Sequence, residues 1–296
     1  MKCLFVYNPN SGKKKILSAL DEVLGFLASK FGEVEPYATK AVMDAYNFVK
    51  ENVQNYDVLV VSGGDGTLNE CVSAVAKTQK EIPIAYIPSG TVNDVARTLE
   101  IPTNIKKCLK VIDKSQILPY DIMNVGDEFG LYVCCLGIFT ETSYATSQKV
   151  KNIFGKLAYA FHFLKIWFKQ KALRLEIQIG NDKHDGYFSC FFAVNSKSLS
   201  GFNINKNADM NDGNVDLFFI KTKSEKIRLL DKLRLFKVYL RGIDKVKENK
   251  YIKKYNVPNI KISSEENLAV NLDGEKREMK SFEINVIKDK IKFFRG

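Results

Sequence analysis

Histidine is scarce in this chain, with 2 residues among 296. A zinc site built from histidines and a Ser-His-Asp hydrolase are therefore both disfavoured. The 6 cysteines form no Cys-x-x-Cys pair and lie in apolar runs, which predicts reduced, buried thiols in a cytosolic protein. No apolar run of the sequence approaches the ~20 residues that span a bilayer. The apolar start, Cys3 to Tyr7, is too short for the core of a signal peptide, so we expect a cytoplasmic location.

Positive charge is what the chain has in excess. Lys and Arg number 45 against 34 Asp and Glu, which gives a net charge of +11. Such a surface favours an anionic partner: a nucleotide, a nucleic acid or acidic lipid headgroups. The sequence contains no RNP-type run, helix-turn-helix pattern or zinc module, so we expect no nucleic-acid partner. A hydrophobic fraction of 45% and the chain length predict a globular protein of about two domains.

Strand-like and helix-like patterns divide the chain into two regions. Over residues 1–121, apolar runs of strand length alternate with helical spacings, which predicts an α/β domain with a parallel sheet. Over residues 122–296, short strand-like runs separated by Gly, Asn and Asp predict a β-rich domain, a sandwich, with helices near 149–170 and 224–241. Ligands of parallel α/β sheets bind at the carboxyl ends of the strands, so a site is expected in the loops at that edge.

Three polar, glycine-bearing loops each follow a predicted strand and precede a predicted helix. They are Asn8-Pro9-Asn10-Ser11-Gly12, Gly63-Gly64-Asp65-Gly66-Thr67-Leu68-Asn69-Glu70 and Pro88-Ser89-Gly90-Thr91-Val92-Asn93-Asp94. Glycine permits positive φ and the close approach of a ligand, and amides at a helix start bind phosphate. Asp65 would repel phosphates unless Mg²⁺ or a donor lies between them. The alternative is a set of tight strand-to-helix turns, with residues such as Thr67 as helix caps.

Together the three loops resemble the catalytic domain of the diacylglycerol kinase family, which includes sphingosine and ceramide kinases and soluble bacterial lipid kinases. Members carry Asn-Pro-x-Ser-Gly, Gly-Gly-Asp-Gly-Thr-x-Asn-Glu and Pro-x-Gly-Thr-x-Asn-Asp, which occur here in that order from Asn8, Gly63 and Pro88. Gly-Gly-Asp-Gly alone also marks NAD kinases and 6-phosphofructokinases, so the combination carries the resemblance. It implies a fold like that of NAD kinase and diacylglycerol kinase, with a nucleotide site in the cleft between the two domains.

The resemblance also implies which residues hold ATP and Mg²⁺. The ATP contacts would come from the loops and one further threonine: Asn8, Pro9, Asn10, Ser11, Gly12, Thr39, Gly63, Gly64, Asp65, Gly66, Thr67, Leu68, Asn69, Glu70 and Thr91. The carboxylates of Asp65, Asp94 and Asp121 would join a network of water and Mg²⁺ near the phosphates. Such a network would supply the partner that Asp65 needs beside phosphates.

A segment of the β-rich region, residues 212–216, resembles a family segment that holds a structural Mg²⁺ in the bacterial lipid kinases. The resemblance implies three ligands: the carboxylate of Asp212 and the backbone carbonyls of Asp209 and Asn214. An oxygen-only shell suits a hard cation. A solvated Asp-Gly turn is the alternative, and residues 198–208 depart from the glycine-rich stretch of relatives.

The triplet Asp273-Gly274-Glu275 lies between two strand-like runs, where spacing alone predicts a charged hairpin turn. In relatives the glutamate of this triplet is the general base, which implies that Glu275 takes the proton of the acceptor hydroxyl. The implied activity is transfer of the γ-phosphoryl group of ATP to a lipid hydroxyl, with diacylglycerol giving phosphatidic acid. The alternatives are a kinase of another lipid alcohol or of NAD, and a nucleotide-binding module without catalysis.

Two basic stretches bear on the partners. Residues 149–171 mix bulky apolar side chains with lysines, the pattern of a helix that lies on an anionic membrane or, more commonly, covers a sheet with its lysines solvated. Residues 221–254 are dense in Lys and Arg. With a lipid substrate, we expect a cytoplasmic protein that contacts the acidic inner membrane surface peripherally. Relatives can dimerise, so a homodimer is one expected state, although no residue of this chain argues for it.

Overall fold

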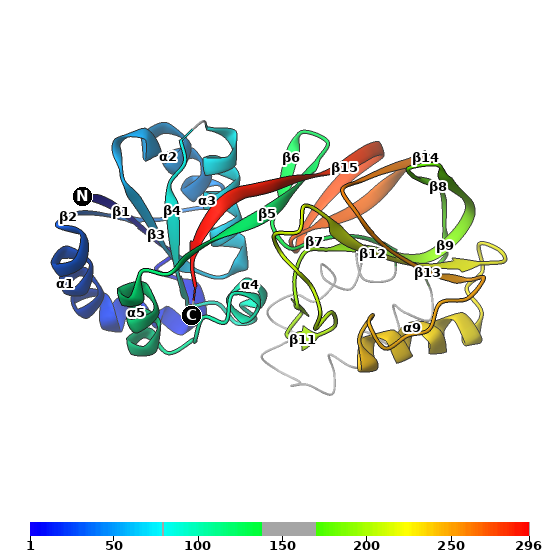
Figure 1. Cartoon of the computed structure of the whole chain (residues 1–296), viewed down its shortest axis with the longest axis horizontal. Coiled ribbons are helices and arrows are strands. Elements are labelled where there is room, and N and C mark those ends of the chain that lie inside the picture. Colours follow the sequence, from blue (N-terminus) through cyan, green and yellow to red (C-terminus); the bar gives the residue numbers. More distant parts are fainter. Residues whose placement is uncertain (79, 138–169, 296) are drawn as a thin grey trace.

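The computed structural model describes residues 1–78, 80–137 and 170–295. Figure 1 shows two lobes side by side, one of strands flanked by helices and one made mainly of strands. We call the first the α/β lobe, built on β1 to β4 with α1 to α5. We call the second the β-rich lobe, built on β6 to β14 with α9. The strands β5 and β15 connect the two.

The α/β lobe contains a parallel sheet in the order β4-β3-β1-β2. Its strands are β1 (Lys2–Tyr7), β2 (Glu33–Ala38), β3 (Val58–Gly63) and β4 (Pro83–Pro88). Its helices are α1 (Leu20–Phe31), α2 (Asp44–Asn52), α3 (Asp65–Lys77), α4 (Asp94–Thr98) and α5 (Ile105–Lys114). Because parallel strands share a direction, the loops after β1, β3 and β4 all lie at one edge of this sheet.

Apolar patterning explains the layers of this lobe. The strand β3 is buried along its whole length, as expected of a parallel strand that helices cover on both faces. The helix α3 turns Leu68, Cys71 and Val75 inward, at the spacing of one helical face. The helix α5 begins after Asn104, whose side chain accepts a hydrogen bond of 3.1 Å from the backbone N–H of Lys107.

The β-rich lobe is built from antiparallel pairs. Its elements, with the connecting strand β5 (Ile117–Val125) before them and β15 (Glu275–Phe294) after them, are β6 (Glu128–Gly130), β7 (Val133–Gly137), β8 (Leu173–Ile179), β9 (Asp182–Val194), β10 (Ser198–Leu199), β11 (Phe202–Asn203), β12 (Val215–Thr222), α9 (Leu229–Arg241), β13 (Ile252–Val257) and β14 (Asn259–Leu272). The helix expected near 224–241 is present as α9. The helix expected near 149–170 lies outside the described residues.

Four strands of this lobe close a ring, because β7 and β8 each pair with both β9 and β14. One face of these strands packs into a second hydrophobic core, with Ile177, Phe191 and Val270 among its members. Other buried side chains of β7 and β9, such as Val133 and Phe192, belong to the core that extends from the α/β lobe. Long strands make the ring possible, since β9 and β14 have 13 and 14 residues and each reaches two partners along its length. The sandwich predicted from the sequence stays a prediction.

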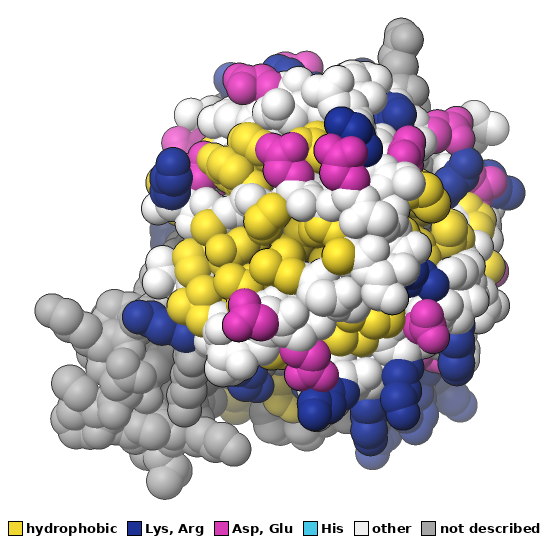
Figure 2. Space-filling view, turned by 90° about the vertical axis from the view of Figure 1, so that its left-hand side faces the viewer, with side chains coloured by type: hydrophobic (Ala, Val, Ile, Leu, Met, Phe, Trp, Pro, Cys, Tyr) yellow, Lys and Arg dark blue, Asp and Glu magenta, His cyan; other side chains and the backbone are white. Residues whose placement is uncertain are grey.

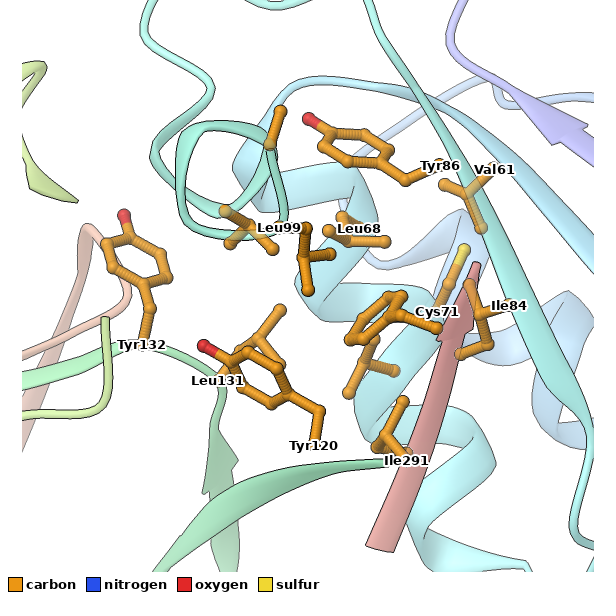
Figure 3. Packing of buried hydrophobic residues seen from close by; sticks show 14 of the residues in the cluster. Val61, Leu68, Cys71, Ile84, Tyr86, Leu99, Tyr120, Leu131, Tyr132 and Ile291 are labelled. Carbon is orange, nitrogen blue, oxygen red and sulfur yellow. The ribbon is translucent and has the colours of Figure 1, made fainter. Parts of the chain in front are cut away.

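The last strand, β15, joins the two lobes. It begins as the partner of β14 and ends as the partner of β5 and, in parallel, of β4. Figure 3 shows the core continuing across this junction, where Tyr120 lies between Leu131 and Ile291. The domain boundary predicted between residues 121 and 122 falls inside β5 and stays a prediction.

Figure 2 shows the end of the molecule where β2 and α1 lie. Hydrophobic side chains gather in the middle of this face, and both acidic and basic side chains border them. The edge strand β2 contains Pro36, which has no N–H group to offer to a further strand. This end of the sheet is therefore poorly suited to pairing with another strand.

All six cysteines are buried and free, so the prediction of buried thiols is confirmed. Burial raises the pKa of both Cys3 and Cys108 to about 12, which keeps these side chains protonated and unreactive. Over the part of the chain that the structure describes, no helix is long and apolar enough to cross a membrane.

Candidate active site

The three glycine-bearing loops meet at the carboxyl edge of the parallel sheet. The backbone N–H of Asn8 donates to the carbonyl of Ser62 over 2.8 Å, which ties the first loop to the end of β3. The N–H groups of Ser89 and Gly90 donate to the carbonyl of Gly63 over 2.8 and 3.1 Å, which ties the third loop to the second. The loops that the sequence singled out therefore form one connected unit.

Packing between the loops explains two of their glycines, Gly12 and Gly90. Gly12 has a φ of +52°, and a Cβ there would lie 1.6 Å from the carbonyl oxygen of Ser89. A Cβ on Gly90 would lie 2.5 Å from the Cα of Gly64. Gly66 differs, since nothing lies within 4 Å of its Cβ position. The sequence attributed glycines of the loops to the approach of a ligand. Packing accounts for Gly12 and Gly90, whereas Gly66 leaves open space.

Replacing Gly12 with Ala is expected to weaken ATP binding more than replacing Gly126 with Ala. Both glycines have positive φ, +52° and +60°, a conformation that costs an L-residue roughly 1–2 kcal/mol. A Cβ at Gly126 meets nothing within 4 Å, whereas one at Gly12 must displace Ser89. We expect Gly12→Ala to weaken ATP binding about tenfold or more, because shifts of ~1 Å in a site have effects of this size. Calorimetric titration of both variants with ATP measures this, and equal losses would contradict it.

Two largely buried carboxylates lie behind the loops. Asp65 accepts hydrogen bonds of 3.1 and 3.2 Å from the backbone N–H groups of Asp94 and Val95 at the start of α4. One oxygen of Asp94 accepts two bonds from the β-rich lobe, 2.6 Å from the hydroxyl of Ser198 and 2.9 Å from the N–H of Gly201. Burial, and to a smaller extent the charge of Asp94, raises the pKa of Asp65. Among the described residues neither carboxylate belongs to an ion pair.

A third buried carboxylate, Asp273, is a candidate that the sequence analysis did not select. It lies in the turn between β14 and β15 with a φ of +52°. Its Oδ1 accepts hydrogen bonds from the backbone N–H groups of Tyr132 and Val133 at 2.9 and 2.8 Å. Its Oδ2 accepts from the N–H of Leu131 and, at 2.7 Å, from Nδ2 of Asn69 on α3. Burial raises the pKa of Asp273 to about 6. This carboxylate holds the hairpin against the helix of the second loop.

Glu275 is the first residue of β15 and is exposed in a pocket between the lobes. This interlobe pocket has a volume of about 450 Å³. From the α/β lobe it is lined by residues of α2, α3 and the turn before α2, and from the other side by β6 and the β14–β15 hairpin: Val42, Met43, Tyr46, Gly66, Asn69, Glu70, Ser73, Lys77, Asp127, Glu128, Phe129, Leu272, Glu275 and Arg277. Glu275 thus faces the same space as the second loop.

A smaller pocket of about 210 Å³ lies over the first loop and is called the loop pocket. Five residues predicted to contact ATP line it, namely Asn8, Asn10, Thr39, Thr67 and Glu70. The two pockets are neighbours, because Val42 and Glu70 line both. Burial raises the pKa of Glu70, and the charge of Glu275 acts in the same direction.

Some predicted residues lie away from these pockets. The side chain of Leu68 is fully buried in the core, so only its backbone is available to a ligand. Thr91 is exposed on the third loop. Asp121 lies on β5 and accepts hydrogen bonds of 2.7 Å from the N–H groups of both Gly213 and Asp289. The structure therefore brings Asp65 and Asp94 together and places Asp121 beside the loop that precedes β12.

The loop that precedes β12 carries the residues predicted to hold a structural Mg²⁺. One oxygen of Asp212 accepts from the N–H of Asn214 at 2.8 Å, and the other accepts from Nδ2 of Asn256 at 3.1 Å. The side chain of Asp209 accepts from the N–H of Asn211 at 3.3 Å. Across residues 1–78, 80–137 and 170–295, no group of three or more His, Cys, Asp or Glu is placed to hold a metal ion. The predicted shell contains only one carboxylate, with two backbone carbonyls. The absence of such a group therefore does not test the structural Mg²⁺ site, which stays a prediction.

Comparison with known proteins identifies the family. The diacylglycerol kinase catalytic domain matches residues 2–125. Curated proteins named diacylglycerol kinase from Staphylococcus saprophyticus and Staphylococcus aureus are 31% and 33% identical to this chain over 272 residues. These alignments cover 91% of this chain and 87% and 84% of the relatives. The chain belongs to the diacylglycerol kinase family, as its three loops predicted.

Solved structures share the fold along the whole chain. A crystal structure from Bacillus anthracis, of a protein provisionally assigned as a diacylglycerol kinase, superposes with a TM-score of 0.84 at 24% identity and covers 100% of this chain and 95% of its own. A crystal structure of a diacylglycerol kinase from the same organism gives a TM-score of 0.79 at 21% identity, covering 100% and 97%. The chain therefore has a diacylglycerol kinase-like fold.

Proposed function

We propose that this chain is an ATP-dependent lipid kinase that transfers the γ-phosphoryl group to the hydroxyl of diacylglycerol and forms phosphatidic acid. Membership of the diacylglycerol kinase family supports ATP as the phosphoryl donor, and the names of the relatives support diacylglycerol as the acceptor. One observation carries the proposal: Glu275 and the second loop line the same pocket from opposite lobes.

ATP would lie across the loop pocket and the adjoining part of the interlobe pocket. Its phosphates would be held at the start of α3, where free backbone N–H groups and the helix dipole favour negative charge. Gly66 leaves space there for a close approach. The side chain of Asn8, whose Nδ2 donates to the hydroxyl of Thr67 at 3.3 Å, would fix the wall of the loop pocket. This arrangement supports a nucleotide site at the interlobe cleft predicted from the sequence.

The residues present fit a Mg²⁺ ion that accompanies ATP. Each oxygen of Asp65 accepts one of its two hydrogen bonds and keeps a lone pair, which suits a hard cation. One oxygen of Asp94 already accepts two hydrogen bonds, so we assign Asp94 the role of attracting the ion through its negative charge. Bound Mg²⁺ would neutralise charge on the phosphates. A second, structural Mg²⁺ near Asp209, Asp212 and Asn214, with Asp121 beside it, is part of the same proposal.

Glu275 would accept the proton of the acceptor hydroxyl as the phosphoryl group arrives. Its hairpin is held to α3 through Asp273 and Asn69, so the base and the phosphate loop would keep a fixed separation. Fixed positions matter because the transfer of a phosphoryl group depends mainly on alignment and charge neutralisation. Asp273 therefore enters the proposal as a positioning residue.

The proposed location is the cytoplasm, with peripheral contact at the inner membrane surface where diacylglycerol resides. The net charge of +11 supports attraction to acidic headgroups. A homodimer is retained as a proposal on the behaviour of the resembled family alone.

Incubation with labelled ATP and Mg²⁺ tests the function directly. The purified chain is given a total lipid extract, purified diacylglycerol or NAD in separate reactions, and the labelled product is identified. We expect labelled phosphatidic acid from the first two. Labelled NADP instead would assign NAD as the acceptor, and bound ATP without any labelled product would leave a nucleotide-binding module.

A further inference from the structure

The helix α9 has three leucines exposed and two charged side chains buried. Leu229, Leu230 and Leu233 are 62%, 64% and 53% exposed, whereas Asp231 and Lys232 are only 1% and 7% exposed. A helix on the surface of a soluble protein normally turns its leucines toward the core and its charges toward water. The exposed side of α9 is therefore an apolar face, which we call the α9 face and define by these three leucines.

Two neighbouring arginines partly neutralise the buried acid. The carboxylate of Asp231 accepts a hydrogen bond of 2.6 Å from Arg234 and lies 3.7 Å from Nε of Arg228. Its place in the first turn of the helix, where the dipole favours negative charge, lowers the cost of burying it. Val238, which is 5% exposed, packs inward two turns later. Asp231 and Val238 thus lie on the inner side of α9, and the three leucines of the α9 face lie at the surface.

The segment that contains the α9 face is rich in basic residues. Helical spacing places exposed Arg241 eleven residues, about three turns, after Leu230 and hence on the same side. Residues 223–250 contain ten Lys and Arg against four Asp and Glu, a net charge of +6 out of the +11 of the whole chain. Two of these four acidic side chains already form ion pairs, because Asp231 is buried beside its arginines and Glu225 pairs with Lys171 at 2.7 Å. The surroundings are thus positive.

We propose that the α9 face, with the basic residues around it, docks on an anionic lipid bilayer. This rests on the proposed function, whose substrate resides in such a bilayer. The leucines would enter the boundary between headgroups and acyl chains, and the Lys and Arg side chains would contact the acidic headgroups. The apolar surface at the β2 end lacks this complementarity, since acidic and basic side chains border it in similar measure. Figure 1 places α9 at the opposite end of the molecule.

Co-sedimentation with lipid vesicles tests the docking surface. The full chain is mixed, without ATP, with vesicles of phosphatidylcholine or of phosphatidylcholine and phosphatidylglycerol. We expect binding to the anionic vesicles and little to the neutral ones. A variant with Leu229→Gln, Leu230→Gln and Leu233→Gln should lose binding roughly tenfold or more, since glutamine keeps helix propensity and removes the apolar insertion. Arg241→Gln should reduce binding about fivefold.

A double variant of exposed apolar residues elsewhere is the matched control. Leu17 and Ile117 are 42% and 40% exposed, and Leu17→Gln with Ile117→Gln should bind vesicles like the unaltered chain. Circular dichroism and thermal unfolding establish that all variants are folded. Equal binding to both kinds of vesicle, or an unaltered affinity in the triple variant, overturns the proposal. A triple variant that becomes monomeric while its vesicle binding persists would assign the α9 face to a second copy of the chain.

Two measurements separate this proposal from the proposed function. Turnover of a short-chain diacylglycerol dispersed in solution should be the same in the triple variant and the unaltered chain, because no bilayer is involved. A chain that binds anionic vesicles through α9 but phosphorylates no lipid would refute the kinase activity and leave the surface standing. A chain that phosphorylates dispersed diacylglycerol but ignores anionic vesicles would refute the surface alone.

Discussion

Glu275→Gln is expected to lower phosphoryl transfer roughly 10²- to 10⁴-fold, the usual contribution of a general base. Glutamine has nearly the same size and keeps a hydrogen-bonding oxygen, but it cannot take up the proton of the acceptor hydroxyl. Because Glu275 is exposed at the wall of the interlobe pocket, the free energy of unfolding should change by no more than about 0.5 kcal/mol. Initial rates with diacylglycerol vesicles, ATP affinity and thermal unfolding measure the three quantities.

Glu278→Gln is the matched control for this substitution. Glu278 lies on the same strand, is exposed, and pairs with Lys276 at 3.1 Å, a surface ion pair worth at most about 1 kcal/mol. The same chemical change at this position should leave the rate unaltered. Near-normal turnover in Glu275→Gln, or an equal loss in Glu278→Gln, would place the base elsewhere in the pocket.

Asp273→Ala is expected to lower the free energy of unfolding by roughly 3–5 kcal/mol, since it leaves several buried donors without an acceptor at a cost of about 1–3 kcal/mol each, with partial compensation. The orphaned donors would be the amides of Leu131, Tyr132 and Val133 and the side chain of Asn69. Loss of this contact also frees the Glu275 hairpin from α3, so the rate at saturating substrate should fall while ATP binding is largely kept.

Asp113→Ala provides the comparison for stability. Asp113 is an exposed carboxylate that pairs with Lys30 at 3.4 Å, so its removal should cost less than about 1 kcal/mol. Chemical denaturation of both variants gives the difference in unfolding free energy. A cost at Asp273 no larger than that at Asp113 would show that the buried donors find other partners.

The pH dependence of Asp273 has opposite signs for stability and for activity. The folded pKa of about 6 lies above the reference value of 3.8, so protonation stabilises the native state. This contribution is complete below about pH 4 and is lost as the pH rises through 6, a change of about 3 kcal/mol. Activity should instead fall as the pH drops below 6, because each oxygen of Asp273 already accepts two hydrogen bonds and a proton must displace one donor. In Asp273→Asn, this fall in activity below pH 6 should disappear from the plot of rate against pH.

The loops of the site were predictable because their signals are local. A strand, a glycine-bearing turn and a helix start lie within a few residues of Asn8, of Gly63 and of Pro88, and the parallel direction of the strands brings all three turns to one edge. The reason for the individual glycines was not predictable. The close contact between Gly12 and Ser89 joins positions 77 residues apart, and neither neighbourhood contains a sign of the other.

Long-range contacts account for the rest of what the sequence did not reveal. Asp273 belongs to a predicted hairpin turn, but the amides that it accepts lie about 140 residues earlier in the chain. In the same way, the apolar and basic residues of α9 predicted a helix but not which side it buries. The helix buries Asp231 and Lys232 and exposes three of its leucines, which is the reverse of what an amphipathic pattern predicts.

The path of β15 has a consequence for how the chain is made. The four parallel strands are synthesised by residue 88, yet the outer edge of β4 is paired by Lys292 and Phe293, which follow about 200 residues later. Until β15 has been synthesised and has docked, that edge presents unsatisfied N–H and C=O groups to other strands. Loss of Lys292 and Phe293 would therefore expose an edge of the sheet that is synthesised first, although these residues lie in the second half of the chain.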